Sequence, residues 1–535
     1  MVAQVTAKLA TPDVVWSALV PQLILMIGGV VMLTVVSLVK GKAPKGTYAT
    51  YTVLVALASL ISTIPLWHRV QHLAEGPASL VGGAVGFDGF SLFVIAVICI
   101  GVILAALLAD DYLRREGIEG PELYVLLLLA ASGGGIMASA NDLIVLFIGL
   151  EILSLSAYVL AAIHARRVSS QEAGMKYFVL GSFASAFLLY GIAMVYGATG
   201  STSLVDIQHY LSTTIITHDG MLLVGIALLL VGFAFKVAGV PFHSWAPDVY
   251  QGSPSPISAF MASVVKVAAF AGLVRVISLS LVAYRLEWRP VVFAIAALSL
   301  LVGSFSALVQ TNVKRMLAYS SINHAGFLLV GIQAAGRGTA AVLFYLAAYT
   351  FMVAGSFGVV TIVGGTGDSH HSLESYRGLS RRRPALALAF TLFLLAQAGV
   401  PFTAGFLAKL GVIQAAASTH NWSLAIIAML TAVVSAFLYL RIIVSMYFEP
   451  ASADEVEPAR SPVPLGAKLA LGISVLGTLA LGIVPGPFEH LAKDARPVLV
   501  AEPTTGTAAA NLRPATGGTA PTGSGSTAGQ STTGG

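Results

Sequence analysis

Long apolar segments fill most of this chain of 535 residues. A membrane-spanning helix needs about 20 consecutive, mostly apolar residues. Fourteen segments of that kind begin near Val15, Tyr51, Ser91, Tyr124, Asp142, Tyr177, Met221, Pro256, Val291, Arg315, Ala340, Ala385, Leu424 and Ala467. Because lipid offers the backbone no hydrogen-bond partners, each segment must be a helix. Only 10% of the residues are charged and the mean hydropathy is +0.87, values that exclude a soluble globular chain. The sequence therefore predicts an all-α polytopic membrane protein with about fourteen transmembrane helices.

The lysines and arginines divide unevenly between the two sides of the predicted membrane. When the loops are assigned alternately to each side, seventeen of the 29 cations fall on one side, eight on the other and four within spans. Cytoplasmic loops carry an excess of these residues. The first side is thus predicted to be cytoplasmic, and both termini are predicted to face outward. The net charge of +5 then reflects membrane topology and gives no reason to expect nucleic-acid binding.

Recognisable cofactor sites are missing from the sequence. Cys99 is the single cysteine and lies in the third apolar segment, which excludes disulfides within the chain and cysteine-ligated iron–sulfur clusters. No Gly-x-Gly-x-x-Gly motif follows a strand, and no P-loop occurs. We expect no cofactor, no metal site and no catalytic redox centre in this chain.

The pentapeptide Ala-Gly-Val-Pro-Phe occurs twice, at residues 238–242 and 398–402. Pro241 and Pro401 are each expected to break a helix within an apolar segment, and each lies near a lysine. The copies are 160 residues apart, and the fourth to eighth segments pair with the ninth to thirteenth at a similar offset. Because five is an odd number of crossings, the second repeat must be inverted. Inverted repeats with broken helices are typical of transporters.

This pattern divides the chain into five parts. We predict three N-terminal transmembrane helices (1–120), a first five-helix repeat (121–288), a second, inverted repeat (289–448), and a loop with a C-terminal transmembrane helix (449–500). Residues 501–535 are rich in Gly, Thr, Ala, Ser and Pro and have almost no large apolar side chains. They are expected to form a disordered low-complexity tail.

Five ionisable residues within the spans carry the predicted chemistry: Glu151, Lys236, Lys266, His324 and Lys409. Each charge near the bilayer centre costs about 2.5–3.5 kcal/mol on insertion scales, so several retained together indicate a function. A glutamate beside a lysine lowers this cost, and weakening that pair favours release of the lysine proton. Histidine can relay protons near neutral pH because its ordinary pKa is about 6.5. These residues predict a proton path along the membrane plane.

Structural roles are the alternative for the same residues. Glu151 and Lys236 can form a static pair, and His324 can simply hydrogen-bond a neighbouring carbonyl group.

Two further cations, Lys176 and Arg275, lie near the ends of spans, where long cationic side chains commonly snorkel to the interface.

A polar segment follows the first predicted break, on the predicted cytoplasmic face. His243 and Asp248 lie in it. They either line a proton entrance, which is the interpretation we favour, or cap helices.

At this point the chain resembles a known family. Residues 236–266 read KVAGVPFHSWAPDVYQGSPSPISAFMASVVK, which is similar to the signature of the antiporter-like membrane subunits of respiratory NADH:quinone oxidoreductase, complex I. Residues 149–160 (GLEILSLSAYVL) and 175–185 (MKYFVLGSFAS) resemble subunit N of that complex in particular. The resemblance extends from about the fourth to the thirteenth span.

The resemblance implies a role for each buried residue. Glu151 and Lys236 match the family's modulating pair, Lys266 and His324 its central relays, and Lys409 the twelfth-span residue that is lysine in subunit N and usually glutamate in subunit M. It implies a subunit that translocates protons without a redox centre of its own, in a bacterial inner membrane. FMN, iron–sulfur clusters and quinone would be bound by partner subunits, and the neighbours would be other membrane subunits of complex I. The tail has no counterpart in the family pattern.

Two other functions compete with this interpretation. The same lysines would serve a stand-alone cation/proton antiporter with sodium as the counter-substrate. A purely scaffolding membrane subunit would tolerate neutral replacements of all five residues, but so many buried ionisable groups are needlessly costly in a scaffold.

Overall fold

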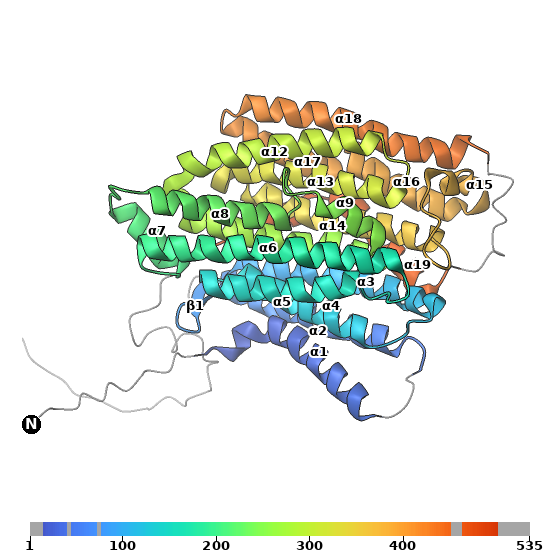
Figure 1. Cartoon of the computed structure of the whole chain (residues 1–535), viewed down its shortest axis with the longest axis horizontal. Coiled ribbons are helices and arrows are strands. Elements are labelled where there is room, and N and C mark those ends of the chain that lie inside the picture. Colours follow the sequence, from blue (N-terminus) through green and yellow to red (C-terminus); the bar gives the residue numbers. More distant parts are fainter. Residues whose placement is uncertain (1–13, 40–43, 72–75, 451–462, 501–535) are drawn as a thin grey trace, which may run out of the picture.

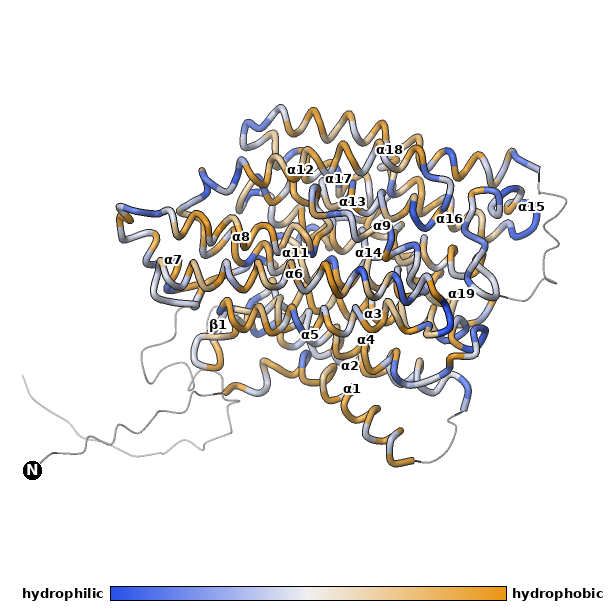
Figure 2. The backbone as a smooth tube through the Cα atoms, in the orientation of Figure 1, coloured by the Kyte–Doolittle hydropathy of each residue, from blue (hydrophilic) through white to orange (hydrophobic). Residues whose placement is uncertain are grey.

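The helices of the computed structural model run side by side in one bundle (Figure 1). The structure describes residues 14–39, 44–71, 76–450 and 463–500. The tail predicted over residues 501–535 lies outside these described residues. Apolar residues line the helices, and polar residues gather at the helix ends (Figure 2).

Three long helices and a small hairpin form the N-terminal part. The elements are α1 (Val20–Leu38), α2 (Thr47–Gln71), β1 (Ala78–Leu80), β2 (Val85–Phe87) and α3 (Gly89–Glu116), with a 3₁₀ turn at Trp16–Leu19. The two strands pair antiparallel. Asp88 caps α3 by accepting a hydrogen bond from the Ser91 amide at 2.8 Å, so the hairpin leads directly into the helix.

The next part contains the first predicted repeat. Its helices are α4 (Glu122–Ser139), α5 (Leu143–Ala161), α6 (Val168–Thr199), α7 (Leu204–Thr213), α8 (Gly220–Lys236), α9 (Trp245–Gly252), α10 (Ser255–Phe260) and α11 (Lys266–Arg275). Two π-helical turns, Met261–Val265 and Val276–Ser280, flank α11.

The remaining helices contain the second predicted repeat and the C-terminal crossing. They are α12 (Arg285–Leu308), α13 (Val313–Gln333), α14 (Thr339–Val363), α15 (Leu379–Arg382), α16 (Pro384–Ala398), α17 (Ala404–Ser418), α18 (Trp422–Phe448), α19 (Leu465–Ile483) and α20 (Gly486–Asp494), with 3₁₀ turns at Val282–Tyr284, Ala335–Arg337 and Leu373–Tyr376.

The number of crossings agrees with the prediction. Eleven described helices are long and apolar enough to span a membrane. Three further crossings bring the total to the expected fourteen: α8 with α9, α16 with α17, and α13, a helix of 21 residues that carries more polar side chains. The first two are the helices that were predicted to be broken at Pro241 and Pro401. The all-α polytopic fold is therefore confirmed.

Matching backbone contacts support the inverted repeats. The residue before α5 pairs with the residue before α7 as an isolated bridge, Asp142 with Ser203, and Asn312 before α13 pairs in the same way with Ser372. In each case the amide of the first helical residue also donates to the segment across the bridge: Leu143 to the Thr202 carbonyl at 2.9 Å, and Val313 to the His371 carbonyl at 2.7 Å. The two bridges align α5 with α13 at an offset of 170 residues.

The two ends of the bundle differ in charge. We call the end with Arg114, Arg167, Arg315 and Arg382 the basic end; it includes α15 and lies to the right in Figures 1 and 2. The amphipathic helix α7 and the β1–β2 hairpin lie at the opposite end. Neither of these two elements was predicted, because both are shorter than a membrane span.

Helices α4 and α5 approach each other closely at two glycines. A Cβ atom on Gly133 would lie 2.7 Å from the Gly149 carbonyl oxygen, and one on Gly149 would lie 2.8 Å from the Gly133 carbonyl oxygen. Small residues allow this kind of close backbone packing in membranes. Gly149 lies two residues before Glu151, so this contact helps to position that carboxylate.

Replacing Gly133 with valine should force α4 and α5 apart. Overpacking of this kind typically costs about 1–3 kcal/mol. We expect a lower thermal unfolding midpoint for the Gly133→Val protein in detergent. The matched control is Gly472→Val on α19, where an added Cβ meets no atom within 4 Å; equal midpoints for the two variants would contradict the packing argument.

Candidate functional site

The first helix break is stabilised by hydrogen bonds to its freed backbone groups. α8 ends at Lys236, and Ala238 takes a left-handed conformation with φ +58°. The Gly239 amide donates to the Ala234 carbonyl at 2.7 Å, and the Val240 amide donates to Ser299 Oγ of α12 at 2.9 Å. Pro241 has no amide hydrogen to satisfy. Irregular backbone can therefore lie within the bundle at this point.

The second break has the same five residues but a different conformation. Here Gly399 has φ +92° and ends α16, and its amide bonds to the Leu395 and Ala396 carbonyls. Thr403 Oγ1 donates to the Val400 carbonyl at 2.6 Å before α17 begins. Identical pentapeptides thus adopt different backbones because the helices packed around them differ.

Lys236 is buried and held by two hydroxyl groups of α5. Its Nζ donates to Ser154 Oγ at 2.7 Å and to Tyr158 Oη at 2.9 Å, and its side chain is 5% exposed. The Tyr158 ring lies 5.2 Å from the ammonium group, measured to the ring centroid. These neutral acceptors solvate the charge without a counter-ion.

Glu151 lies on the same face of α5 as the two hydroxyl groups that hold Lys236, since residues 151, 154 and 158 are about one and two helical turns apart. It accepts a hydrogen bond from Ser185 Oγ of α6 at 2.5 Å. Within the described part of the chain, no ion pair joins Glu151 to Lys236. The structure places the predicted pair as neighbours separated by hydroxyl groups.

Lys266 and His324 meet along α13. Lys266 Nζ donates to both the carbonyl and Oγ of Ser321, at 2.6 and 2.5 Å. The ring nitrogens of His324 contact Tyr345 Oη at 2.6 Å and Tyr439 Oη at 3.2 Å. The Tyr349 ring lies between the two groups, 5.6 Å from the Lys266 ammonium and 4.7 Å from the His324 ring. The partners of the His324 ring are thus tyrosine hydroxyls and not backbone carbonyls.

Lys409 reaches back from α17 to the second break. Its Nζ donates to the Ala398 carbonyl, at the end of α16, at 3.0 Å. It also lies 4.9 Å from the centroid of the Phe327 ring, which stacks on Tyr345, a partner of His324. Lys266, His324 and Lys409 therefore belong to one group of residues joined through aromatic rings.

Several polar residues of the site were missed from the sequence. Ser320 Oγ contacts Tyr439 Oη at 2.6 Å and donates to Gln397 Oε1 at 3.3 Å, while Gln397 Nε2 donates to Ser356 Oγ at 2.7 Å. These residues reach His324 through Tyr439, whereas Ser154 and Tyr158 hold Lys236. A signal was present for Ser356 and Gln397, because each is a polar residue within an otherwise apolar helix.

The two residues predicted to line an entrance both lie near the first break, but their surroundings differ. Asp248 on α9 forms ion pairs with Lys176 at 2.8 Å and with Arg315 at 2.6 Å, which places it at the basic end. His243 is partly buried in the turn before α9. Their role in proton entry stays a prediction.

Arg275 does not snorkel, so that expectation is wrong. Its side chain is fully buried and its guanidinium contacts both oxygens of Asp88 at 2.7 Å. Its partner Asp88 directly precedes α3, so the arginine is neutralised inside the protein. Lys176 does remain partly exposed and pairs with Glu172 and Asp248.

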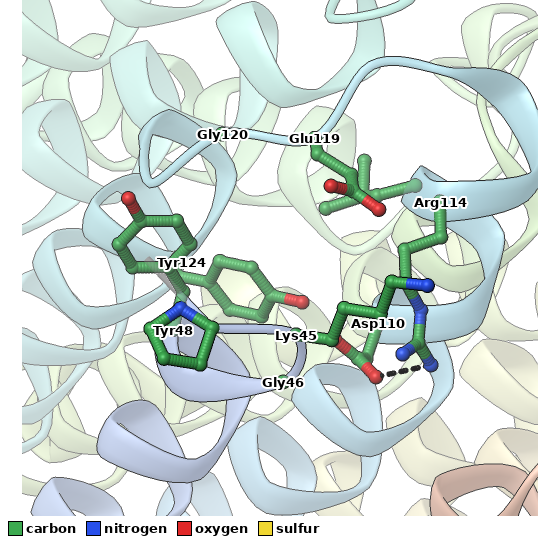
Figure 3. A pocket seen from close by; sticks show the side chains of 10 residues that line it. Lys45, Gly46, Tyr48, Asp110, Arg114, Glu119, Gly120 and Tyr124 are labelled. Carbon is green, nitrogen blue, oxygen red and sulfur yellow. Dashed lines mark ion pairs between the residues drawn. The ribbon is translucent and has the colours of Figure 1, made fainter. Parts of the chain in front are cut away.

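The described residues contain no group of three or more His, Cys, Asp or Glu side chains that could hold a metal ion. Figure 3 shows a small pocket at the basic end, where Asp110 pairs with Arg114 beside Lys45, Tyr48 and Tyr124. Its cavity volume is about 40 Å³, enough for a few water molecules but far too small for a quinone or a nucleotide.

Comparison with known proteins places this geometry in context. Residues 140–435 match the protein family described as NADH:quinone oxidoreductase/Mrp antiporter. NADH-quinone oxidoreductase subunit N of Trichlorobacter lovleyi is 39% identical over 480 residues, covering 90% of this chain and 96% of that protein. A chain of respiratory complex I from Thermus thermophilus superposes with a TM-score of 0.72 at 33% identity, covering 88% of this chain and 98% of the other.

A chain of the Mrp complex from Dietzia superposes with a TM-score of 0.75, covering 90% of this chain and 97% of the other. At 21% identity it shows a common fold alone.

Replacing Tyr158 with phenylalanine should leave the Lys236 ammonium with one partner fewer. A hydrogen bond to a charged group is worth about 1.5–3 kcal/mol. We expect the Tyr158→Phe protein to unfold at a lower temperature in detergent than the unmodified protein. Tyr190→Phe, on the exposed face of α6, serves as the control. An unchanged midpoint for Tyr158→Phe would show that this bond does not stabilise the buried lysine.

Proposed function

Since this chain belongs to the family of NADH-quinone oxidoreductase subunit N, we propose that it translocates protons as a non-redox membrane subunit of such a complex. Quinone reduction takes place in other subunits, and its energy reaches this chain as a change in electrostatic interactions. The chain itself would act as part of a translocase and bind no redox cofactor.

One observation carries this proposal: the buried cations fall into two classes. Arg275 and Lys314 each contact a buried carboxylate, Asp88 and Asp368 respectively. Within the described residues, Lys236, Lys266 and Lys409 have no carboxylate at ion-pair distance, and their hydrogen-bond acceptors are neutral. Burial without a counter-ion disfavours the charged form of an amine. The second class is thus suited to exchanging protons, whereas the first is suited to structure.

Proton movement would follow the row of these groups. Glu151 lies near enough to Lys236 to act on its charge through space, and the hydroxyls of Ser154, Ser185 and Tyr158 lie around the two residues. A rearrangement of these hydroxyl groups would change how strongly Lys236 holds its proton. The proton would then pass by way of Lys266 and His324 to Lys409. His243 and Asp248 are the proposed entrance.

The surroundings follow from the same proposal. The basic end would face the cytoplasm and both termini would face outward, in a bacterial inner membrane. Neighbouring antiporter-like and small membrane subunits of complex I would pack against the chain. Partner subunits would supply FMN, iron–sulfur clusters and the quinone site.

The second candidate function is that of a stand-alone cation/proton antiporter. The description of the matching family, which includes Mrp antiporters, favours it, although sequence identity is higher to the subunit N proteins than to the Mrp chain. Vesicles that contain only this protein would show sodium-dependent proton flux if it were such an antiporter. Under our proposal they show none.

Neutralising the proposed pair should stop coupled proton transport. We expect Lys236→Met or Glu151→Ala, in the assembled complex, to lower proton pumping driven by NADH oxidation about tenfold or more, because a positioned proton-transfer group contributes about 10²–10⁴-fold. NADH oxidation with an artificial electron acceptor measures assembly independently. Lys468→Met, an exposed lysine on α19, is the matched control. Full pumping by an assembled Glu151→Ala complex would contradict the role of the pair.

A further inference from the structure

A buried ion cluster at the basic end contains none of the three lysines that we assign to proton transfer. Its centre is Asp368, in the loop between α14 and α15, whose side chain is fully buried. One carboxylate oxygen accepts from Arg167 at 3.0 Å, Lys314 at 3.3 Å and the Ser255 amide at 3.2 Å. The other accepts from Ser255 Oγ at 2.7 Å and contacts His371 Nε2 at 2.8 Å. Five groups thus converge on one carboxylate.

The charges of this cluster do not cancel. Burial alone would raise the pKa of Asp368, but Lys314, His371 and Ser255 outweigh it and hold that pKa well below its usual range. Burial lowers the pKa of the His371 ring, whereas Arg167 and Lys314 supply two partners of opposite charge to Asp368. One anion then faces two cations, so loss of the Asp368 charge would leave Arg167 and Lys314 without compensation. Such a loss is strongly unfavourable in a buried site.

The groups bound to Asp368 come from both repeats. Arg167 precedes α6, and Ser255 begins α10, directly after the broken span α8–α9. Lys314 lies in the first turn of α13 and also donates to the Ser253 carbonyl at 2.6 Å. The carboxylate therefore joins the turn between α9 and α10 to the start of α13.

The crossing that begins with α10 and the helix α13 also meet at Lys266. Lys266 follows Ser255 by eleven residues along α10 and the π-helical turn, and its acceptor Ser321 follows Lys314 by seven residues, two turns along the same face of α13. At the opposite end of this crossing, Arg275 is anchored to Asp88. The crossing that carries Lys266 is wholly buried and is held at both ends by a carboxylate from another part of the chain.

We propose that Asp368 is a positioning residue of the proton path: it holds the start of α10 against the start of α13 and so maintains the contact between Lys266 and Ser321. This proposal rests on the function proposed above. Asp368 itself carries no proton in it. Its charge is needed because two cations from different repeats share it.

The test uses the complete complex in membrane vesicles. We expect Asp368→Asn to lower protons pumped per NADH oxidised about tenfold or more, because the neutral amide loses the charge-assisted contacts with Arg167 and Lys314. The double variant Asp368→Asn with Arg167→Gln removes one cation with the anion and should restore much of the pumping. A role in packing alone would not produce this rescue. Glu374→Gln, an exposed acid in the same loop, is the control and should pump normally.

Ser255→Ala tests the same contact without changing any charge. It removes the 2.7 Å hydrogen bond to Asp368 and should lower pumping per NADH even if the Asp368→Asn complex fails to assemble. Normal pumping by Ser255→Ala or by an assembled Asp368→Asn complex would overturn the role of Asp368, and so would the lack of rescue in the double variant. The Lys236→Met complex is measured in parallel. Full pumping by Lys236→Met would contradict the proposed function itself. Low pumping by Lys236→Met with normal pumping by the Asp368 and Ser255 variants would contradict only the role of Asp368.

Discussion

The structure depends on one constraint, that a group buried away from water must find its partner within the chain. Helix breaks are possible only where side chains such as Ser299 and Thr403 replace lost helical hydrogen bonds or tighten the turn. Buried arginine and lysine obey the same rule in two ways. Some meet a carboxylate and become fixed. Others meet only hydroxyl and carbonyl oxygens, which solvate the charge without neutralising it, and these are the lysines that we assign to proton transfer.

The repeats provide a symmetric framework with asymmetric chemistry. The paired bridges align α5 with α13 at an offset of 170, so Glu151 corresponds to Ser321 and Ser154 to His324. Ser154 and Ser321 both accept from a buried lysine, Lys236 and Lys266 respectively. Each of these two helices thus supplies a serine acceptor to a buried lysine, at positions three residues apart in the alignment. The carboxylate occurs in the first repeat and the imidazole in the second, and Asp368 connects the two at the basic end.

Much of the fold and of the site could be read from the sequence because lipid imposes simple rules. Helix number, the two breaks and the buried ionisable residues follow from the length of apolar segments and from interruptions in them. The hairpin and α7 escaped detection because short elements at a helix end leave no such periodic signal. The hydroxyl partners escaped because serine and tyrosine occur in apolar helices for many reasons, and spacing along one helix does not show which neighbour they face.

The sequence by itself determined that the chain is a bundle of membrane-crossing helices with two repeated breaks and a small set of costly buried charges. Only the tertiary structure decided how each charge is compensated. Two copies of Ala-Gly-Val-Pro-Phe take different backbones, and Arg275 is paired although it was expected at the interface. The physical reason is the same in both cases: the free energy of a buried polar group depends on the atoms that surround it, and these come from helices distant in the sequence.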